Sequence, residues 1–232
     1  MPLVLVHGLV VSSRMVEPLL GALARHGFHV LAPDLPGFGE STKPPRALKL
    51  TELADALALW AQASGIARAL YVGASFGCHV IVELALRHPS LVDQLVLLGP
   101  GPEPAARSVP RALWRQAVNS QREPRSLGEI SRIDYAKAGL RRALATIRIA
   151  LHARIEDKLP LVRMPTLVLR GDCDLIAPQA WAEHATSLLP RGRLMVVDGA
   201  HVLSYGAPEA AAAAIVDFLR ENPLSPHAGV GT

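Results

Sequence analysis

Residues 70–78 read Leu70-Tyr71-Val72-Gly73-Ala74-Ser75-Phe76-Gly77-Cys78, and this stretch predicts a strand, a sharp turn and a helix. An apolar, β-prone run ends in a G-x-S-x-G pattern, and a helical run over residues 79–88 follows at once. A turn this tight forces strained backbone angles on the residue at its tip, and its neighbours two positions away must be small. Gly73 and Gly77 meet that demand. The pattern therefore predicts that Ser75 projects above a helix N-terminus, whose partial positive charge can stabilise an oxyanion.

Strand and helix patterns alternate on both sides of this turn. Apolar strands are predicted at residues 2–6, 28–32, 69–74, 93–98, 165–170 and 193–197, with helices between most of them. Alternation of this kind is typical of an α/β fold, in which a mostly parallel sheet carries helices on both faces. From residue 103 to about 158 only helical segments are predicted. We therefore interpret residues 1–100 and 160–222 as the core, 101–159 as an inserted helical cap and 223–232 as a C-terminal tail.

Three predicted strands end in residues that can carry chemistry. Ser75 follows one strand, Gly171-Asp172-Cys173-Asp174 follows a second, and Gly199-Ala200-His201 follows a third. The carboxyl ends of parallel strands meet at one edge of a sheet, where ligands bind. A serine hydroxyl needs a base within reach to become a nucleophile, and the base needs a carboxylate to orient it. The sequence thus predicts a Ser-Asp-His site, with Asp174 and Asp172 as rival acids.

With these motifs, the chain resembles the α/β-hydrolase fold superfamily. Further matching segments are His7-Gly8 and the loop from Asp34 to Ser41. The resemblance covers roughly residues 3–100 and 160–221. It implies that Ser75 is the nucleophile, His201 the base and Asp174 the acid, because the family places the carboxylate three residues after the glycine. It also implies an oxyanion hole made by the backbone N–H groups of Leu9 and Phe76, with His7 in a structural role.

The nucleophile separates this chain from some relatives. Relatives with aspartate at the turn are epoxide hydrolases and haloalkane dehalogenases, and relatives with cysteine are dienelactone hydrolases. Ser75 leaves esterases, lactonases, thioesterases, carbon–carbon hydrolases and cofactor-free haloperoxidases. We expect a carboxylesterase for small or medium lipophilic esters that needs no cofactor. Trp114, Leu113, Ile130, Tyr135 and Leu140 could line its apolar pocket or simply dock the cap.

Two alternatives stay open. Residues 101–163 contain 13 of the 24 Lys and Arg residues but 6 of the 20 Asp and Glu residues, a local charge of +7. A basic rim of this kind could attract an anionic substrate of a carbon–carbon hydrolase, lactonase or thioesterase. Carbon–carbon hydrolases of this fold commonly have asparagine where this chain has Ala74. The other alternative is a non-catalytic ligand-binding protein on the same fold.

Composition bounds the setting of the protein. Two cysteines, Cys78 and Cys173, cannot build a disulfide framework, and the N-terminus lacks the basic start of a signal peptide, so we expect a cytoplasmic protein. No apolar run is long enough to cross a bilayer, so we expect no membrane span. No metal-ligand spacing and no nucleic-acid-binding motif stands out, so no metal or nucleic acid is expected.

The family usually carries two further strands before the His-Gly strand, which here starts at residue 2, so the fold is trimmed or the recorded start is late. By analogy with the strand order of the family, the run Phe28–Ala32 then becomes an apolar sheet edge. We expect this edge to pair two copies into a homodimer, and the alternative is that a loop or the C-terminal tail covers it.

Overall fold

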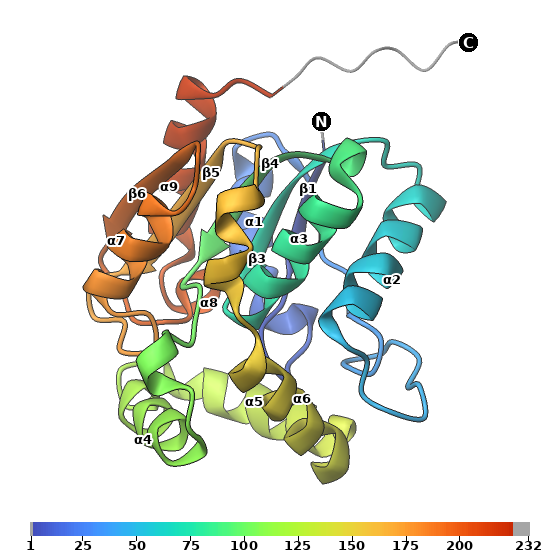
Figure 1. Ribbon diagram of the computed structural model, residues 1–232, viewed down its shortest axis with the longest axis vertical. Coiled ribbons are helices and arrows are strands. Elements are labelled where there is room, and N and C mark those ends of the chain that lie inside the picture. The colour runs from blue at the N-terminus through green and yellow to red at the C-terminus, as the bar shows by residue number, and fades with distance from the viewer. Residues whose placement is uncertain (1, 225–232) are drawn as a thin grey trace.

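The centre of the protein is a six-stranded parallel sheet, shown by a computed structural model that describes residues 2–224 (Figure 1). The strand order is β2-β1-β3-β4-β5-β6, and each neighbouring pair is parallel. The strands are β1 (Pro2–Val6), β2 (His29–Leu31), β3 (Ala69–Ala74), β4 (Val92–Leu98), β5 (Thr166–Gly171) and β6 (Gly192–Val197). The predicted α/β fold is confirmed, and all the carboxyl ends of the strands face the same end of the molecule.

Helices cover both faces of this sheet. One face packs against α2 (Leu50–Ala63), α3 (Phe76–Arg87) and α7 (Gln179–Ser187), and the other against α1 (Glu17–Arg25) and α9 (Pro208–Glu221). Side chains alternate between faces along a strand, so Val4 and Val6 enter the first core while Leu3 and Leu5 enter the second. Burial on both faces explains why the strands read as continuous apolar runs.

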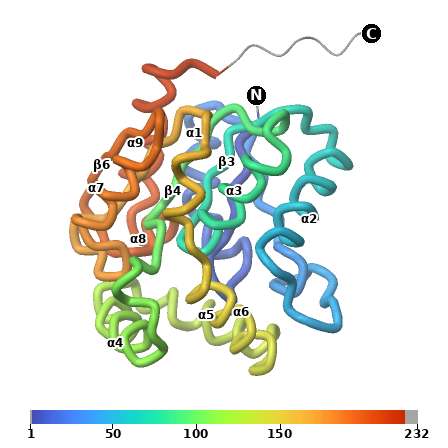
Figure 2. The backbone as a smooth tube through the Cα atoms, viewed as in Figure 1, coloured from blue at the N-terminus to red at the C-terminus, as the bar shows by residue number. Residues whose placement is uncertain are grey.

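A second layer lies over the carboxyl ends of the strands. It consists of α4 (Val109–Ser120), α5 (Arg125–Ala138) and α6 (Leu140–His152), which lie together at one end of the molecule (Figure 2). Arg107 and Glu156 form a bidentate ion pair that joins the beginning of this segment to its end. Because both side chains are largely shielded from water, this pair fixes the two connections between cap and core more firmly than an exposed pair would.

Strand β2 lies at one edge of the sheet, as the resemblance to the family implies. It is three residues long rather than five, and His29 is its exposed member. Self-association through this edge stays a prediction. Residues 225–232 of the expected tail lie outside the described residues. Within residues 2–224, none of the helices has both the length and the apolar character needed to cross a membrane.

Candidate active site

The turn between β3 and α3 holds Ser75 in a strained conformation. Its φ is +51° and its ψ is −110°, a region that residues with a side chain rarely adopt. The Ser75 N–H donates to the carbonyl of Leu98 at 2.8 Å, which ties the turn to β4. A Cβ on Gly77 would lie 2.4 Å from the carbonyl oxygen of Val6, and one on Gly73 would lie 2.6 Å from the backbone of Gly77. The two glycines thus let the backbone close tightly enough to force this conformation on Ser75.

Ser75, His201 and Asp174 form one hydrogen-bonded chain. The Ser75 Oγ lies 2.9 Å from His201 Nε2, and His201 Nδ1 lies 2.9 Å from Asp174 Oδ2. The structure therefore brings together three residues that are far apart in the sequence but each follow a strand. A Cβ on Gly171 would lie 2.2 Å from the carbonyl oxygen of Gly199, so glycine at this position allows the loops of the acid and the base to approach each other.

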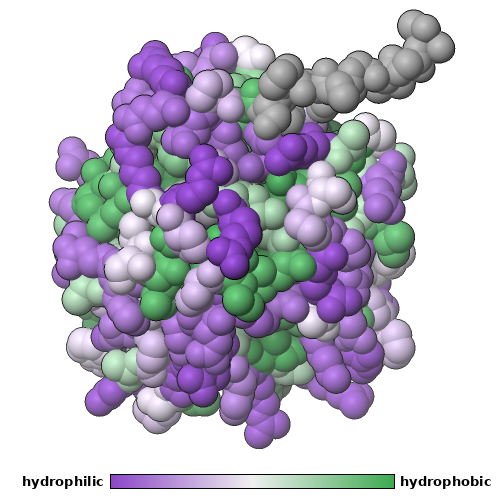
Figure 3. All heavy atoms as spheres, turned by 45° about the horizontal axis from the view of Figure 1, so that its top comes forward, coloured by the Kyte–Doolittle hydropathy of each residue, from purple (hydrophilic) through white to green (hydrophobic). Residues whose placement is uncertain are grey.

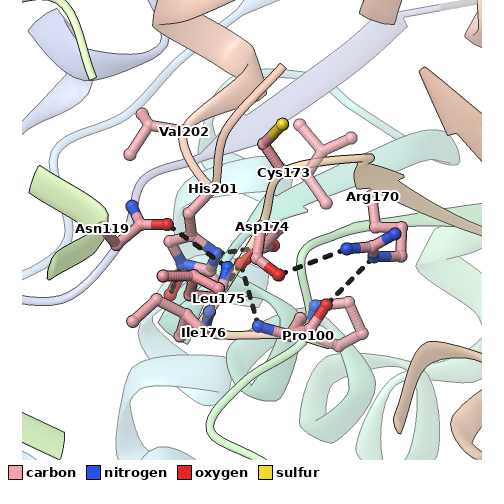
Figure 4. A network of polar contacts seen from close by, with 12 residues as sticks. Pro100, Asn119, Arg170, Cys173, Asp174, Leu175, Ile176, His201 and Val202 are labelled. Atoms are coloured by element: carbon pink, nitrogen blue, oxygen red, sulfur yellow. Dashed lines mark hydrogen bonds and ion pairs between the residues drawn. The ribbon is translucent and has the colours of Figure 1, made fainter. Parts of the chain in front are cut away.

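The two candidate acids occupy different places. Asp174 is buried, and its Oδ1 accepts hydrogen bonds from the N–H groups of Ile176 at 2.7 Å and Ala177 at 2.9 Å. Asp174 lies between His201 and the Arg170 side chain, whose guanidinium donates to the Asp174 carbonyl at 3.2 Å (Figure 4). Asp172 is exposed instead, and its Oδ1 accepts from the Gly199 N–H at 3.0 Å. Asp174 is thus the acid in contact with His201, whereas Asp172 braces the loop that carries His201.

The electrostatics of the pair favour a charged His201. Burial disfavours the charged imidazolium and by itself would lower the pKa of His201. The charge of the Asp174 carboxylate, its hydrogen bond to His201 and the more distant charge of Glu123 outweigh burial. The net result is a pKa of His201 above its usual value. Burial also acts to raise the pKa of Asp174, yet His201 and the two backbone N–H groups overcome it and the pKa is lowered. The site therefore stabilises a proton on His201 while Asp174 remains ionised.

The expected oxyanion donors lie beside Ser75. Leu9 and Phe76 line the same cavity as Ser75 and His201. Phe76 is the first residue of α3, so its N–H has no acceptor within the helix. The buried His7 anchors the loop that carries Leu9. Its Nε2 accepts a hydrogen bond from the Leu35 N–H at 3.0 Å. Burial lowers the pKa of His7, which keeps it neutral and able to accept this bond.

A group of cap residues that sequence reasoning missed holds the loops of both Asp174 and His201. Glu123 Oε1 accepts from the Val202 N–H at 2.9 Å and from the Asn119 side chain at 2.9 Å. Asn119 Oδ1 accepts weakly from the Leu175 N–H at 3.4 Å, as Figure 4 shows. Arg122 donates to the Cys173 carbonyl at 2.9 Å. We call Asn119, Arg122 and Glu123 the cap clamp. No motif marks these residues, because they act on loops that are distant in sequence.

The cavity above Ser75 lies between cap and core and has a volume of about 1630 Å³. Of the residues expected to line a pocket, Leu113, Tyr135 and Leu140 do line it. Trp114 and Ile130 are not among the lining residues. Successive residues on a helix point about 100° apart, so Leu113 can line the cavity while the exposed Trp114 beside it does not. Within residues 2–224, no cluster of three or more His, Cys, Asp or Glu side chains could hold a metal ion.

The cap clamp generates a prediction about the titration of His201. Glu123→Gln keeps an oxygen that can accept from the Val202 N–H but removes a negative charge that raises the His201 pKa. The midpoint of His201 protonation, measured by an NMR titration of its imidazole resonances, should therefore move to lower pH. Glu129→Gln is the matched control, because it removes an exposed charge of the same cap without a contact to either loop. An unchanged midpoint in Glu123→Gln would contradict the electrostatic role of Glu123.

The chain is similar to one known protein family and to several known proteins. Residues 1–123 match the model of the alpha/beta hydrolase fold family. A protein of Mycobacterium phage D29 named "Putative non-heme haloperoxidase" is 29% identical over 91% of this chain and 84% of its own length. A protein of Yersinia enterocolitica named "Putative carbamate hydrolase RutD" is 28% identical over 87% of this chain and 81% of its own length.

Among solved structures, a thermophilic esterase from Thermogutta terrifontis shares the fold. Its TM-score is 0.80 at 24% identity, over 95% of this chain and 90% of the esterase. The match to the family model covers more than half of the chain. The chain therefore belongs to the alpha/beta hydrolase fold family.

Proposed function

We propose that the protein is a serine carboxylesterase that acts on small or medium lipophilic esters. The observation that carries the proposal is the hydrogen-bonded chain from Ser75 through His201 to Asp174, which opens into a cavity lined largely by apolar side chains. A relative named as a carbamate hydrolase and a structural neighbour named as an esterase support the view that the protein is a hydrolase. The apolar lining favours a lipophilic acyl or alcohol group over a highly polar one.

In the proposed mechanism, Ser75 Oγ attacks the ester carbonyl while His201 Nε2 takes the hydroxyl proton. Asp174 holds the His201 tautomer and stabilises the imidazolium that forms. The carbonyl oxygen becomes an oxyanion, to which the N–H groups of Leu9 and Phe76 would donate. Collapse of this intermediate breaks the bond to the alcohol, which leaves with the proton from His201. A water molecule, deprotonated by His201, then attacks the acyl-Ser75 ester, and the acid product leaves as Ser75 regains its proton.

A second candidate is hydrolysis of an anionic ester, lactone or thioester. It is favoured by the charged side chains in the cavity wall, which are cationic in every case among the described residues: Arg46, Lys49, Arg115, Arg141, Arg142 and Arg148. Arg46 forms an ion pair with Glu52, and Arg115 forms one with Glu103. These two cations therefore contribute less to the attraction of an anionic substrate than the others do. The other four cations have no carboxylate partner within residues 2–224 and would exert this attraction: Lys49, Arg141, Arg142 and Arg148.

A panel of esters, lactones and thioesters distinguishes the two candidates. We expect turnover of neutral p-nitrophenyl esters by the wild type and none above background by Ser75→Ala, because the variant lacks the attacking oxygen. Each acyl group should be offered both as a neutral ester and with a terminal carboxylate. A higher kcat/KM for the neutral member supports the carboxylesterase, whereas a preference for the carboxylate supports the second candidate. Equal turnover by wild type and Ser75→Ala on every substrate would overturn both.

The assignment of the acid gives a sharper test. Asp174→Asn should lower kcat by roughly 10³–10⁴-fold, since it removes the carboxylate that orients His201. Asp172→Asn should cost far less, because an amide oxygen can still accept from the Gly199 N–H. Steady-state kinetics on the best ester would measure both, with circular dichroism to verify folding. A larger loss for Asp172→Asn than for Asp174→Asn would show that the acid is misassigned.

A further inference from the structure

The cap exposes large apolar side chains that the rest of the described surface largely lacks. Seven of the ten exposed large apolar residues within residues 2–224 lie on α4, α5 or α6. Leu140 is 75% exposed, Trp114 is 63% exposed and Leu113 is 60% exposed. By contrast, the face in Figure 3, which brings the end opposite the cap forward, mixes polar and apolar residues. Exposed apolar side chains that gather on one part of a surface mark an interaction site.

Two of these three helices, α4 and α6, carry only positively charged side chains, whereas α5 also contains Glu129 and the buried Asp134. Helix α4 contains Arg111 and Arg115, helix α6 contains Arg141, Arg142 and Arg148, and neither helix contains Asp or Glu. Arg115 is paired with Glu103, and Arg142 donates to backbone carbonyls of the core, but Arg141 and Arg148 are exposed. Helices that lie in the interface of a membrane typically expose leucine and tryptophan side chains together with arginine or lysine. Helices α4 and α6 have this composition.

Four of these exposed apolar side chains also line the cavity that contains Ser75. Val109 and Leu113 of α4, and Leu140 and Leu144 of α6, are exposed to solvent and at the same time line the cavity. We define the cap face as these four residues together with Trp114, Arg141 and Arg148. Because four residues of the cap face line the cavity that contains Ser75, an apolar phase in contact with the cap face would lie next to that cavity.

We propose that the cap face docks on an anionic lipid bilayer, with its leucines and Trp114 in the acyl boundary and Arg141 and Arg148 at the headgroups. The charge pattern selects this occupant over a second copy of the chain. Two cap faces brought together would oppose arginines to arginines, whereas anionic headgroups supply the missing negative charge. The docking goes beyond the proposed function and does not depend on it.

The test is binding of the purified full chain to vesicles of phosphatidylcholine alone or with 30% phosphatidylglycerol. We expect flotation with the anionic vesicles, a blue shift of tryptophan fluorescence that is lost in Trp114→Phe, and at least tenfold weaker binding to phosphatidylcholine. The double variant Leu140→Ser/Leu144→Ser and the single variant Arg148→Glu should each weaken binding to anionic vesicles at least tenfold.

Two matched controls show whether the location matters. Leu59→Ser removes a leucine that is 67% exposed on α2, and Arg191→Glu makes the same change of charge as Arg148→Glu before β6, at the other end of the sheet. Neither control should weaken binding by more than about twofold. The proposal fails if the wild type does not bind anionic vesicles, or if the controls weaken binding as much as the cap-face variants. It also fails if light scattering shows a dimer that Leu140→Ser/Leu144→Ser dissociates, because the occupant is then a second copy.

Discussion

The close approach of α3 to the ends of β1 and β3 is the constraint on which the rest of the site depends. Gly73 and Gly77 leave no room for a side chain between these elements, and the backbone must turn at Ser75 with a positive φ. This turn lifts the Ser75 hydroxyl above the sheet and leaves the first N–H groups of α3 free of helical acceptors. The strain costs free energy that the surrounding parallel sheet, buried on both faces, offsets.

The cap does more than cover the cavity. Through the cap clamp it contacts the loop of Asp174 and the loop of His201, and through Asp134 it reaches the loop that follows Leu9. Asp134 is buried, and its carboxylate accepts from the N–H of Ser12 at 2.8 Å and from the hydroxyl of Ser12 at 2.7 Å. The three loops that the proposed mechanism uses are therefore each bonded to the cap. A displacement of the cap would alter the geometry of the site as well as access to it.

The choice of Asp174 over Asp172 depended on the family resemblance, but the sequence alone was sufficient to predict the sheet, the turn at Ser75 and an acid and a base at the same edge of the sheet. These features depend on local backbone requirements, which glycine spacing and apolar strands record directly. The cap clamp and the members of the pocket were not predictable in the same way. Leu113 lines the cavity while its neighbour Trp114 does not, and only the docking of α4 on the core decides between them. Glu123 likewise acquires its role from contacts with loops that are distant in the chain.

In the proposed mechanism, His201 and Asp174 activate Ser75 as a nucleophile. Reaction with a fluorophosphonate probe, followed by mass spectrometry of the labelled peptide, tests it without knowledge of the natural substrate. We expect a single adduct on Ser75 in the wild type, none in Ser75→Ala, and a rate of labelling at least a hundredfold lower in His201→Ala. An unlabelled wild type, or an adduct on a residue other than Ser75, would contradict this mechanism.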